Sequence, residues 1–288
     1  MTIFTKTHNN MKKLCILACV AMLVACNQNQ PQIPSEVQQD VQVSFAPVRA
    51  PMGDEPTATL ADFCTRLDVW IIQGGETIAV HQSSTDADFG TINLTLNLLN
   101  TYTMRAVGHK GNGEATLTNN VLTFPDDKVT HTLVGSTTFS PATTSAVNLN
   151  MQRVVGQFRL EITDVIPDNV AKLDIDIAQT GTRWNLSTNA AENIIDRSTT
   201  INLTSRTPSG GANLSVYVLP DDMTQAYGYD IHVAAKTSGN VLVEERTFED
   251  VQIQAGYKTT YTGQFFVATP MSFSFAVSDW QSFDPVEF

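Results

Sequence analysis

The stretch Ile92-Asn-Leu-Thr-Leu-Asn-Leu98 alternates strictly between apolar and polar residues. Successive side chains of a β-strand point to opposite faces of a sheet, so this pattern predicts a strand with one buried face. Similar alternation recurs at residues 172–177, 200–203 and 213–219, and turns rich in Asn, Asp and Gly follow the strands. No segment keeps a helical period over three turns, and only single turns are expected, at residues 60–66 and 190–197. The pattern predicts an all-β protein of two antiparallel sandwiches.

The N-terminal segment carries the features of an export signal. A basic pair at residues 12–13 precedes an apolar run over residues 14–23, which is too short to span a bilayer core of roughly 30 Å. Ala25 offers the small residue of a cleavage site, and Cys26 offers a thiol for lipid attachment. The segment resembles a bacterial lipoprotein signal, although a buried N-terminal helix is the alternative. The resemblance implies a signal peptide over residues 1–25, lipoprotein export machinery as a partner, and attachment to a membrane through lipid at Cys26.

The charge balance is strongly acidic, with 29 Asp and Glu residues against 17 Lys and Arg residues. Removal of the signal takes three lysines and no acidic residue, which leaves 14 basic residues and a net charge of −15. Nucleic-acid phosphates need Lys and Arg partners, so this balance argues against nucleic acid as a partner. It favours solubility and repulsion between unassembled copies.

The mature chain is long enough for two domains of ordinary size. Residues 26–40 are rich in Gln, Asn and Pro, which predicts a flexible tether. The first run of strands ends near Asn150, which predicts an N-terminal domain over residues 41–150, a C-terminal domain over 151–270 and a final strand segment over 271–288.

Cys64 is the one cysteine left after lipidation at Cys26 and removal of the signal, so no disulfide within the mature chain is possible. It follows Phe63 in an apolar stretch, which favours a buried and inert thiol over a reactive one.

No residue set suggests catalysis. The chain lacks G-x-S-x-G, H-E-x-x-H, a phosphate-binding glycine loop and a C-x-x-C pair. Asp174 and Asp176 share one face of a strand whose other face is apolar, which is the pattern of an outer sheet surface. The histidines of the mature chain lie far apart in sequence, at His81, His109, His131 and His232. We therefore expect no enzyme, no catalytic residues, no metal site and no cofactor.

Two strand-like segments at opposite ends of the chain share one pattern. The first has Val41, Val43 and Phe45 on one face, and the last has Met271, Phe273, Phe275 and Val277 on one face. Both contain Ser-Phe-Ala in the same phase, at residues 44–46 and 274–276. Two strands of this kind could fill the same apolar groove, because a period of two sets which face points inward. The alternative is that each is an edge strand of its own domain and the match is chance.

Arg49 lies just after the first strand, among prolines that favour an exposed chain. An arginine-specific surface protease could cut between Arg49 and Ala50 and so detach the lipid, the tether and the first strand. The final segment of another copy, residues 271–288 with Trp280, could then complete the open sheet by donor-strand complementation.

Several motifs together resemble the fimbrillin-type pilins of Bacteroidetes, the family of fimbrial subunits and their anchor proteins. These motifs are Leu67-Asp-Val-Trp-Ile-Ile72, Gln152-Arg-Val-Val-Gly156, Val218-Leu-Pro220, Ala255-Gly-Tyr-Lys-Thr-Thr-Tyr-Thr-Gly263, the lipidation motif and the strand that ends at Arg49-Ala50. The resemblance covers nearly the whole chain. It implies two tandem transthyretin-like sandwich domains, a lipid-anchored precursor at the outer membrane, cleavage at Arg49, assembly with other fimbrial subunits and a role in adhesion. Anchor members of that family keep their N-terminal segment, so a stalk, a tip and an anchor role all stay open.

A surface lipoprotein that binds glycan without polymerising is the alternative function. Aromatic side chains can form a platform for a sugar ring, and the chain has three tryptophans. Trp70 lies in an apolar strand and is expected in the core, whereas Trp184 stands between Arg183 and Asn185 and is expected at the surface.

Overall fold

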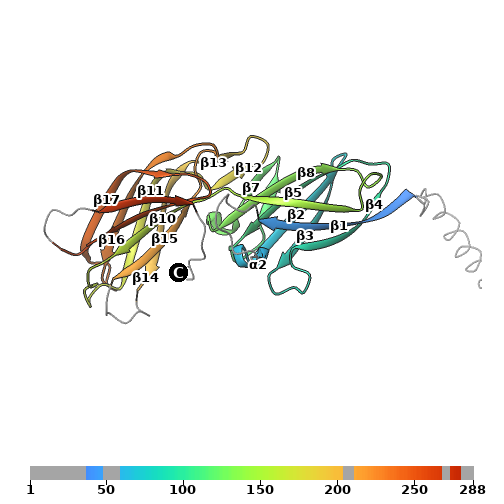
Figure 1. The fold of residues 1–288 in the computed structure, drawn as a ribbon. Helices are drawn as coiled ribbons and strands as arrows, with labels where there is room; N and C mark the ends of the chain where they lie inside the picture. The colour runs from blue at the N-terminus through green and yellow to red at the C-terminus, as the bar shows by residue number, and fades with distance from the viewer. Residues whose placement is uncertain (1–36, 48–58, 204–210, 268–272, 280–288) are drawn as a thin grey trace, which may run out of the picture. The chain divides into compact units, whose positions relative to one another are not determined.

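The computed structural model describes residues 37–47, 59–203, 211–267 and 273–279 (Figure 1). Regular structure in these ranges is almost all β, beside a helical turn α2 (Leu60–Phe63) and a 3-10 turn η2 (Pro125–Asp127). Neither is long and apolar enough to span a membrane. Gln39–Phe288 forms one compact unit. The all-β prediction is confirmed, as is the single turn expected at residues 60–66.

The N-terminal sandwich is built on one seven-stranded sheet whose two ends fold over a common core. Its order is β3-β2-β5-β8-β9-β1-β4. These strands are β1 (Gln38–Pro47), β2 (Arg66–Gln73), β3 (Glu76–Ser83), β4 (Thr91–Asn97), β5 (Tyr102–His109), β8 (Thr132–Phe139) and β9 (Ala146–Arg153). Alternate residues of β1, β2, β4, β5 and β9 meet in one buried apolar cluster, which includes Val43, Leu67, Ile92, Met104 and Leu149. The alternation of residues 92–98 thus places β4 in the sheet with one buried face, as expected.

The C-terminal sandwich consists of two four-stranded sheets, of order β15-β10-β18-β19 and β14-β11-β16-β17. Their strands are β10 (Gly156–Ile162), β11 (Lys172–Thr180), β14 (Ile195–Asn202), β15 (Ala212–Val218), β16 (Tyr227–Lys236), β17 (Leu242–Ile253), β18 (Tyr257–Gly263) and β19 (Ser274–Asp279). The two inner faces pack against each other through a second cluster, which includes Phe158, Ile175, Leu214, Ile231 and Phe248.

The prediction of purely antiparallel sandwiches is wrong at two places. β1 runs parallel to β9, and β10 runs parallel to β18. Strands joined by a tight hairpin must be antiparallel, but the strands of each of these pairs are far apart in sequence. The intervening chain can cross between sheets and return in the same direction.

A fourth sheet joins the two sandwiches, with the order β13-β12-β7-β6. It combines β6 (Thr116–Thr118) and β7 (Val121–Thr123) with β12 (Arg183–Asn185) and β13 (Ala190–Glu192). Trp70, Leu122, Val155 and Trp184 belong to a third apolar cluster beside it. The helical turn expected at residues 190–197 is wrong, because this segment forms β13 and the start of β14. The backbone of β13 is hydrogen-bonded to β12, so this segment does not need the internal hydrogen bonds of a helical turn.

The boundaries predicted from sequence can be placed on this fold. Asn150 lies inside β9, and the change from the first sandwich to the second falls at residues 154–155. The predicted tether ends too late, because β1 already begins at Gln38 and the carboxylate of Asp40 accepts a 2.8 Å hydrogen bond from the Thr95 hydroxyl. This contact joins β1 to β4 at a residue that precedes Val41, the first apolar residue of the strand. The rest of the predicted tether, residues 26–36, lies outside the described residues.

Candidate functional site

The apolar face of β1 is fully enclosed in the N-terminal sandwich. Val41, Val43 and Phe45 are 1%, 0% and 6% exposed, whereas Gln42 and Ala46 on the other face of the strand are exposed to solvent. The period of two predicted from the sequence therefore describes this strand residue by residue. Burial of three such side chains stabilises the sandwich by about 5–9 kcal/mol before ordering costs.

β1 is an interior strand, paired along both edges. Its register with β9 runs from Gln42 opposite Ala146 to Pro47 opposite Met151. On its other side lies β4, and the Phe45 N–H donates a 2.9 Å hydrogen bond to the Gly90 carbonyl. Removal of β1 would therefore open a groove with unpaired backbone on both walls and the apolar cluster at its floor.

The groove left by β1 would be lined by apolar side chains on the adjacent strands. Ile92 and Leu96 of β4 and Val147, Leu149 and Met151 of β9 belong to the same buried cluster as β1. Exposure of these residues would favour any strand that presents apolar side chains at every second position.

β19 carries the matching pattern in the opposite environment. Among the described strands it is the outermost of its sheet and pairs with β18 alone, with Phe275 opposite Tyr261 and Val277 opposite Thr259. Phe275 is 66% exposed and Val277 is 51% exposed. The described end of the chain is thus an edge strand whose apolar side chains are largely in solvent.

Packing holds Phe273, the residue just before β19, more firmly than the apolar residues of the strand itself. The Phe273 ring meets Phe248 of β17 edge to face at 5.0 Å between ring centroids, and a side chain at position 263 would collide with it. Phe275 stacks on Tyr261 at 5.9 Å but gains little cover from it. β17 is an edge strand of the facing sheet, and its side chain Phe248 covers Phe273.

Five of the predicted site residues lie outside the described residues. They are the lipidation site Cys26, the cleavage site Arg49 and Ala50, and Met271 and Trp280 of the C-terminal segment. The described residues bring β1 and β19 into separate sandwiches and separate sheets.

The histidines, which are far apart in sequence, are not all far apart in the fold. His81 and His109 converge on the buried carboxylate of Asp68, at 2.7 Å and 2.9 Å. The Ala115 N–H donates to the same carboxylate at 2.8 Å. Burial opposes ionisation of Asp68, but the hydrogen bonds from His109, His81 and Ala115 outweigh it and lower its pKa.

The hydrogen bonds of the Asp68 cluster indicate a structural role. The Gly111 N–H donates to Nδ1 of His109, so His109 must use its Nε2 proton to reach Asp68. Both nitrogens of this 1% exposed ring are therefore occupied. No sequence pattern predicts the cluster, because Asp68 and His109 lie in different strands and the segment that covers them follows β5.

Two further groups are buried in forms that do not ionise near neutral pH. Burial, together with Arg153 and Lys110, lowers the pKa of His131 to about 3. Its Nε2 accepts a 2.8 Å hydrogen bond from Nε of Arg153. Cys64 is buried, as expected from the sequence, and burial raises the pKa of its thiol to about 12.

The remaining predictions concern the acidic strand face and the tryptophans, and all but the one for Trp184 agree with the structure. Asp174 binds Lys236 at 2.9 Å on the outer face of β11, as expected of a sheet surface. His232 is partly exposed and lies 3.1 Å from Glu245. Trp70 lies in the core as expected, but the expectation of an exposed Trp184 is wrong, because this side chain is 0% exposed. β12 lies between two strands, and its alternation turns the tryptophan into the third cluster.

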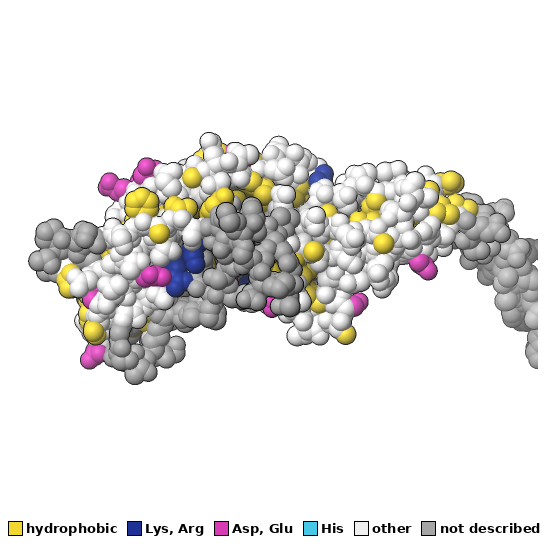
Figure 2. All heavy atoms as spheres, in the orientation of Figure 1, with side chains coloured by type: hydrophobic (Ala, Val, Ile, Leu, Met, Phe, Trp, Pro, Cys, Tyr) yellow, Lys and Arg dark blue, Asp and Glu magenta, His cyan; other side chains and the backbone are white. Residues whose placement is uncertain are grey.

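No metal centre is formed in the ranges that the structure describes, where no three His, Cys, Asp or Glu side chains are placed to share an ion. On the face shown in Figure 2, Lys and Arg side chains are sparse, in keeping with the acidic composition.

Solved structures of Bacteroides proteins share this fold. A protein from Bacteroides ovatus, proposed to act in cell adhesion, has 14% sequence identity and a TM-score of 0.50, over 85% of this chain and 99% of its own. A cell adhesion candidate from Bacteroides uniformis has 15% identity and a TM-score of 0.50, over 86% of this chain and all of its own. A Bacteroides thetaiotaomicron protein proposed to bind polysaccharide has 11% identity and a TM-score of 0.51, over 84% and 98% of the two chains. No protein-family model and no curated protein sequence matches the chain.

Proposed function

We propose that this protein is a structural subunit of a cell-surface fimbria that supports adhesion and acts without catalysis or cofactor. It is exported as a lipoprotein with lipid at Cys26 and is released for assembly by cleavage between Arg49 and Ala50. Cleavage allows β1 to leave its groove, and the C-terminal strand of another subunit takes its place. The two sandwiches are transthyretin-like domains in this proposal.

The contrast between β1 and β19 carries the proposal. β1 has Val43 fully buried between two partner strands, and the strand of the same pattern at the other end of the chain has Phe275 and Val277 in solvent. A protein with no use for this arrangement gains nothing from an exposed apolar edge strand, which promotes aggregation. The fold shared with proteins proposed to act in cell adhesion supports the same function.

Cleavage of the chain shifts the free-energy balance toward exchange of the strand. An uncut β1 is tethered to the sandwich and rebinds at high effective concentration, so an outside strand cannot compete. After cleavage this advantage is lost. A donor strand with four apolar residues offers on the order of 6–12 kcal/mol of gross burial, in addition to main-chain hydrogen bonds on both walls.

The test is digestion of the purified protein with an arginine-specific protease. We expect a new N-terminus at Ala50 and multimers that resist SDS, because exchanged strands would be locked into closed sheets. The variant Arg49→Gln should remain monomeric under the same digestion. A variant that ends at residue 270 should be cut but should not multimerise.

Two results would count against the proposal. Multimers that form equally well without residues 271–288 would remove the donor role of that segment. Cleavage at Arg49 that leaves a stable monomer, even at high protein concentration, would remove the exchange itself.

Glycan binding through Trp184 loses its basis, since that side chain lies in the third cluster. N-terminal sequencing of surface-exposed protein separates the remaining roles. A start at Ala50 indicates a polymerising subunit, and a lipidated start at Cys26 indicates an anchor.

A further inference from the structure

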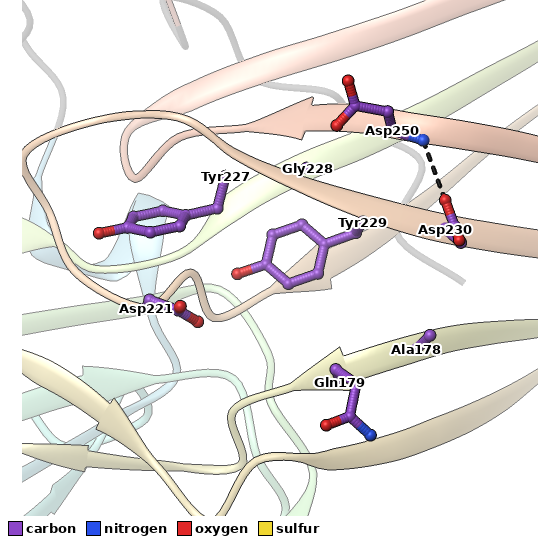
Figure 3. Close-up of a pocket in the computed structure, with 8 residues that line it drawn as sticks. All are labelled: Ala178, Gln179, Asp221, Tyr227, Gly228, Tyr229, Asp230 and Asp250. Atoms are coloured by element: carbon purple, nitrogen blue, oxygen red, sulfur yellow. Dashed lines mark hydrogen bonds between the residues drawn. The ribbon is translucent and has the colours of Figure 1, made fainter.

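A cleft of about 340 Å³ lies in the C-terminal sandwich, between β11, β16, β17 and the loop after β15. Its volume falls within the range of about 300–1,000 Å³ that is typical of small-ligand sites. Two tyrosines and three aspartates dominate its lining, namely Tyr227, Tyr229, Asp221, Asp230 and Asp250 (Figure 3).

The hydroxyl of Tyr229 is the unusual group in this cleft. The side chain is 4% exposed, and its Oη is buried without a hydrogen bond of normal geometry to any described residue. In Figure 3 the hydroxyl points toward Asp221 and the ring of Tyr227. Burial first, and then the Asp221 carboxylate, raise the pKa of Tyr229, so the group is a neutral phenol. A buried hydroxyl without a partner costs stability, and a ligand that accepts from it or donates to it would recover that cost.

The described residues that line the cleft include no Lys or Arg to balance the three carboxylates. Among the described residues, no Lys or Arg forms an ion pair with Asp221, Asp230 or Asp250. Asp230 accepts a 3.0 Å hydrogen bond from the Asp250 N–H, and Asp250 accepts one of 2.8 Å from the Gln252 amide. Each contact occupies one carboxylate oxygen and leaves the other for a ligand.

The backbone is shaped to bring these groups together. β17 has one extra residue opposite Asp230, and Asp250 in this bulge has φ of +50°. A second bulge in β11 holds Gln179, also at φ +50°, on the opposite side of the cleft. Bulges re-aim side chains next to binding sites. At Gly228, a Cβ would lie 1.8 Å from Oδ1 of Asp250, so only glycine lets this carboxylate rest against the strand.

The chemistry of the lining selects the class of ligand. Carboxylate oxygens accept hydrogen bonds, and three uncompensated negative charges create a potential that attracts a cation. The carboxylates are not placed to share a single metal ion in the described structure. A guanidinium has five N–H donors, pairs with carboxylates in bidentate fashion and stacks on aromatic rings such as Tyr227.

We infer that this cleft binds the cationic side chain of a basic peptide segment, with arginine preferred over lysine. Asp230 and Asp250 accept from the guanidinium, Tyr227 packs against its plane, and the Tyr229 hydroxyl gains the partner that it lacks. The site is independent of β1 and β19.

The test uses the purified full-length protein and an acetylated, amidated Gly-Arg-Gly peptide in isothermal titration calorimetry. A peptide with citrulline in place of arginine is nearly the same shape but uncharged, and we expect it to bind at least about tenfold more weakly. Free arginine should bind more weakly than the peptide, because its own carboxylate is repelled by the acidic lining, and equal binding would overturn the assignment to a peptide segment. Binding of the arginine peptide should weaken as salt rises, because its charge partners are exposed.

Variants connect the binding to the cleft. Asp230→Asn and Asp250→Asn should each weaken binding by about three- to tenfold, whereas Glu76→Gln, which removes an exposed carboxylate of the other sandwich, should leave it unchanged. Tyr229→Phe should weaken binding without lowering thermal stability, because the lost hydroxyl makes no hydrogen bond of normal geometry to any described residue. Equal binding of the arginine and citrulline peptides, no binding at millimolar peptide, or binding that is unaffected by these variants would overturn the inference. A neutral oligosaccharide that binds through Tyr229 where the arginine peptide does not would also overturn it.

Discussion

β1 and β19 have the same sequence pattern and opposite environments. Val41, Val43 and Phe45 are enclosed in the N-terminal sandwich, but Phe275 and Val277 of β19 are mostly exposed. Both strands place their apolar side chains at every second position, so the pattern does not cause the difference. The difference comes from position, because β1 has a strand on each side, whereas β19 has one neighbouring strand among the residues that the structure describes.

The contrast shows what alternation can and cannot specify. A period of two determines which side chains share a face. It does not determine whether another layer covers that face. For β1 the cover comes from strands β2 and β5 across the sandwich, through residues such as Leu67 and Met104. For β19 the facing sheet ends at β17, and Phe248 contacts Phe273, the residue just before the strand.

The largest expected effect comes from truncation of β1's apolar face. Phe45→Ala should lower the free energy of unfolding by about 3–5 kcal/mol, because it leaves a cavity in a closed core. Urea denaturation measures this directly. Ala46→Ser, one residue further along on the exposed face, is the matched control and should change stability by less than about 0.5 kcal/mol. Equal effects of the two substitutions would mean that β1 is not held as the structure has it.

A second effect depends on pH and acts on the sandwich that holds β1. His131 has a folded pKa of about 3, whereas an unfolded histidine protonates near pH 6.5. Between these values the unfolded chain binds one more proton, so stability falls as pH falls, by up to about 1.4 kcal/mol per pH unit. Asp68 has a lowered pKa and adds a loss of the same sign below about pH 4, where the unfolded carboxylate becomes protonated.

Urea denaturation at several pH values between 4 and 7 measures this slope. His131→Gln keeps polar groups at the site but does not titrate, so its slope should be shallower than that of the wild type. The same slope in both proteins would contradict the assignment of His131 as a buried neutral ring.

An intermediate effect is expected at the boundary between packed and unpacked parts of the C-terminal segment. Phe273 is partly buried and lies edge to face on Phe248 at 5.0 Å. Phe273→Ala should lower the free energy of unfolding by about 1–2 kcal/mol, because only part of a phenylalanine's burial is lost. Phe273→Leu keeps much of the apolar volume and should lose less. A loss as large as that of Phe45→Ala would show that this segment belongs to the core.

Sequence reasoning succeeded where one strand and its own period were enough. The faces of β1, β4 and β11 follow from alternation, and Leu173, Ile175 and Ile177 are buried as expected. It failed where a distant segment decides the environment. Asp68 stands at a polar position of β2, yet that face is covered by the chain that follows β5, so the aspartate is 0% exposed.

Two features of the sequence around Trp184 point to opposite environments for its side chain. Its neighbours Arg183 and Asn185 are polar, which suggested a solvent-exposed ring. The same three residues also alternate, and in β12 both neighbours turn away from the third cluster while the tryptophan turns into it. The cleft around Tyr229 gave no sequence signal, because it depends on two β-bulges and on contacts between three strands.

The smallest expected effect completes the comparison. Phe275 is 66% exposed and contacts mainly Tyr261, so Phe275→Ala should change the free energy of unfolding of the intact monomer by less than about 0.5 kcal/mol. Urea denaturation of the uncut protein is the measurement, with Phe45→Ala as its counterpart at the same position of the shared pattern. The same variant should nevertheless hinder multimer formation after cleavage at Arg49, because an exchanged strand would bury this ring. A loss above about 1.5 kcal/mol in the monomer would mean that β19 already has its final partner in its own sheet, and the two strands would then not be interchangeable.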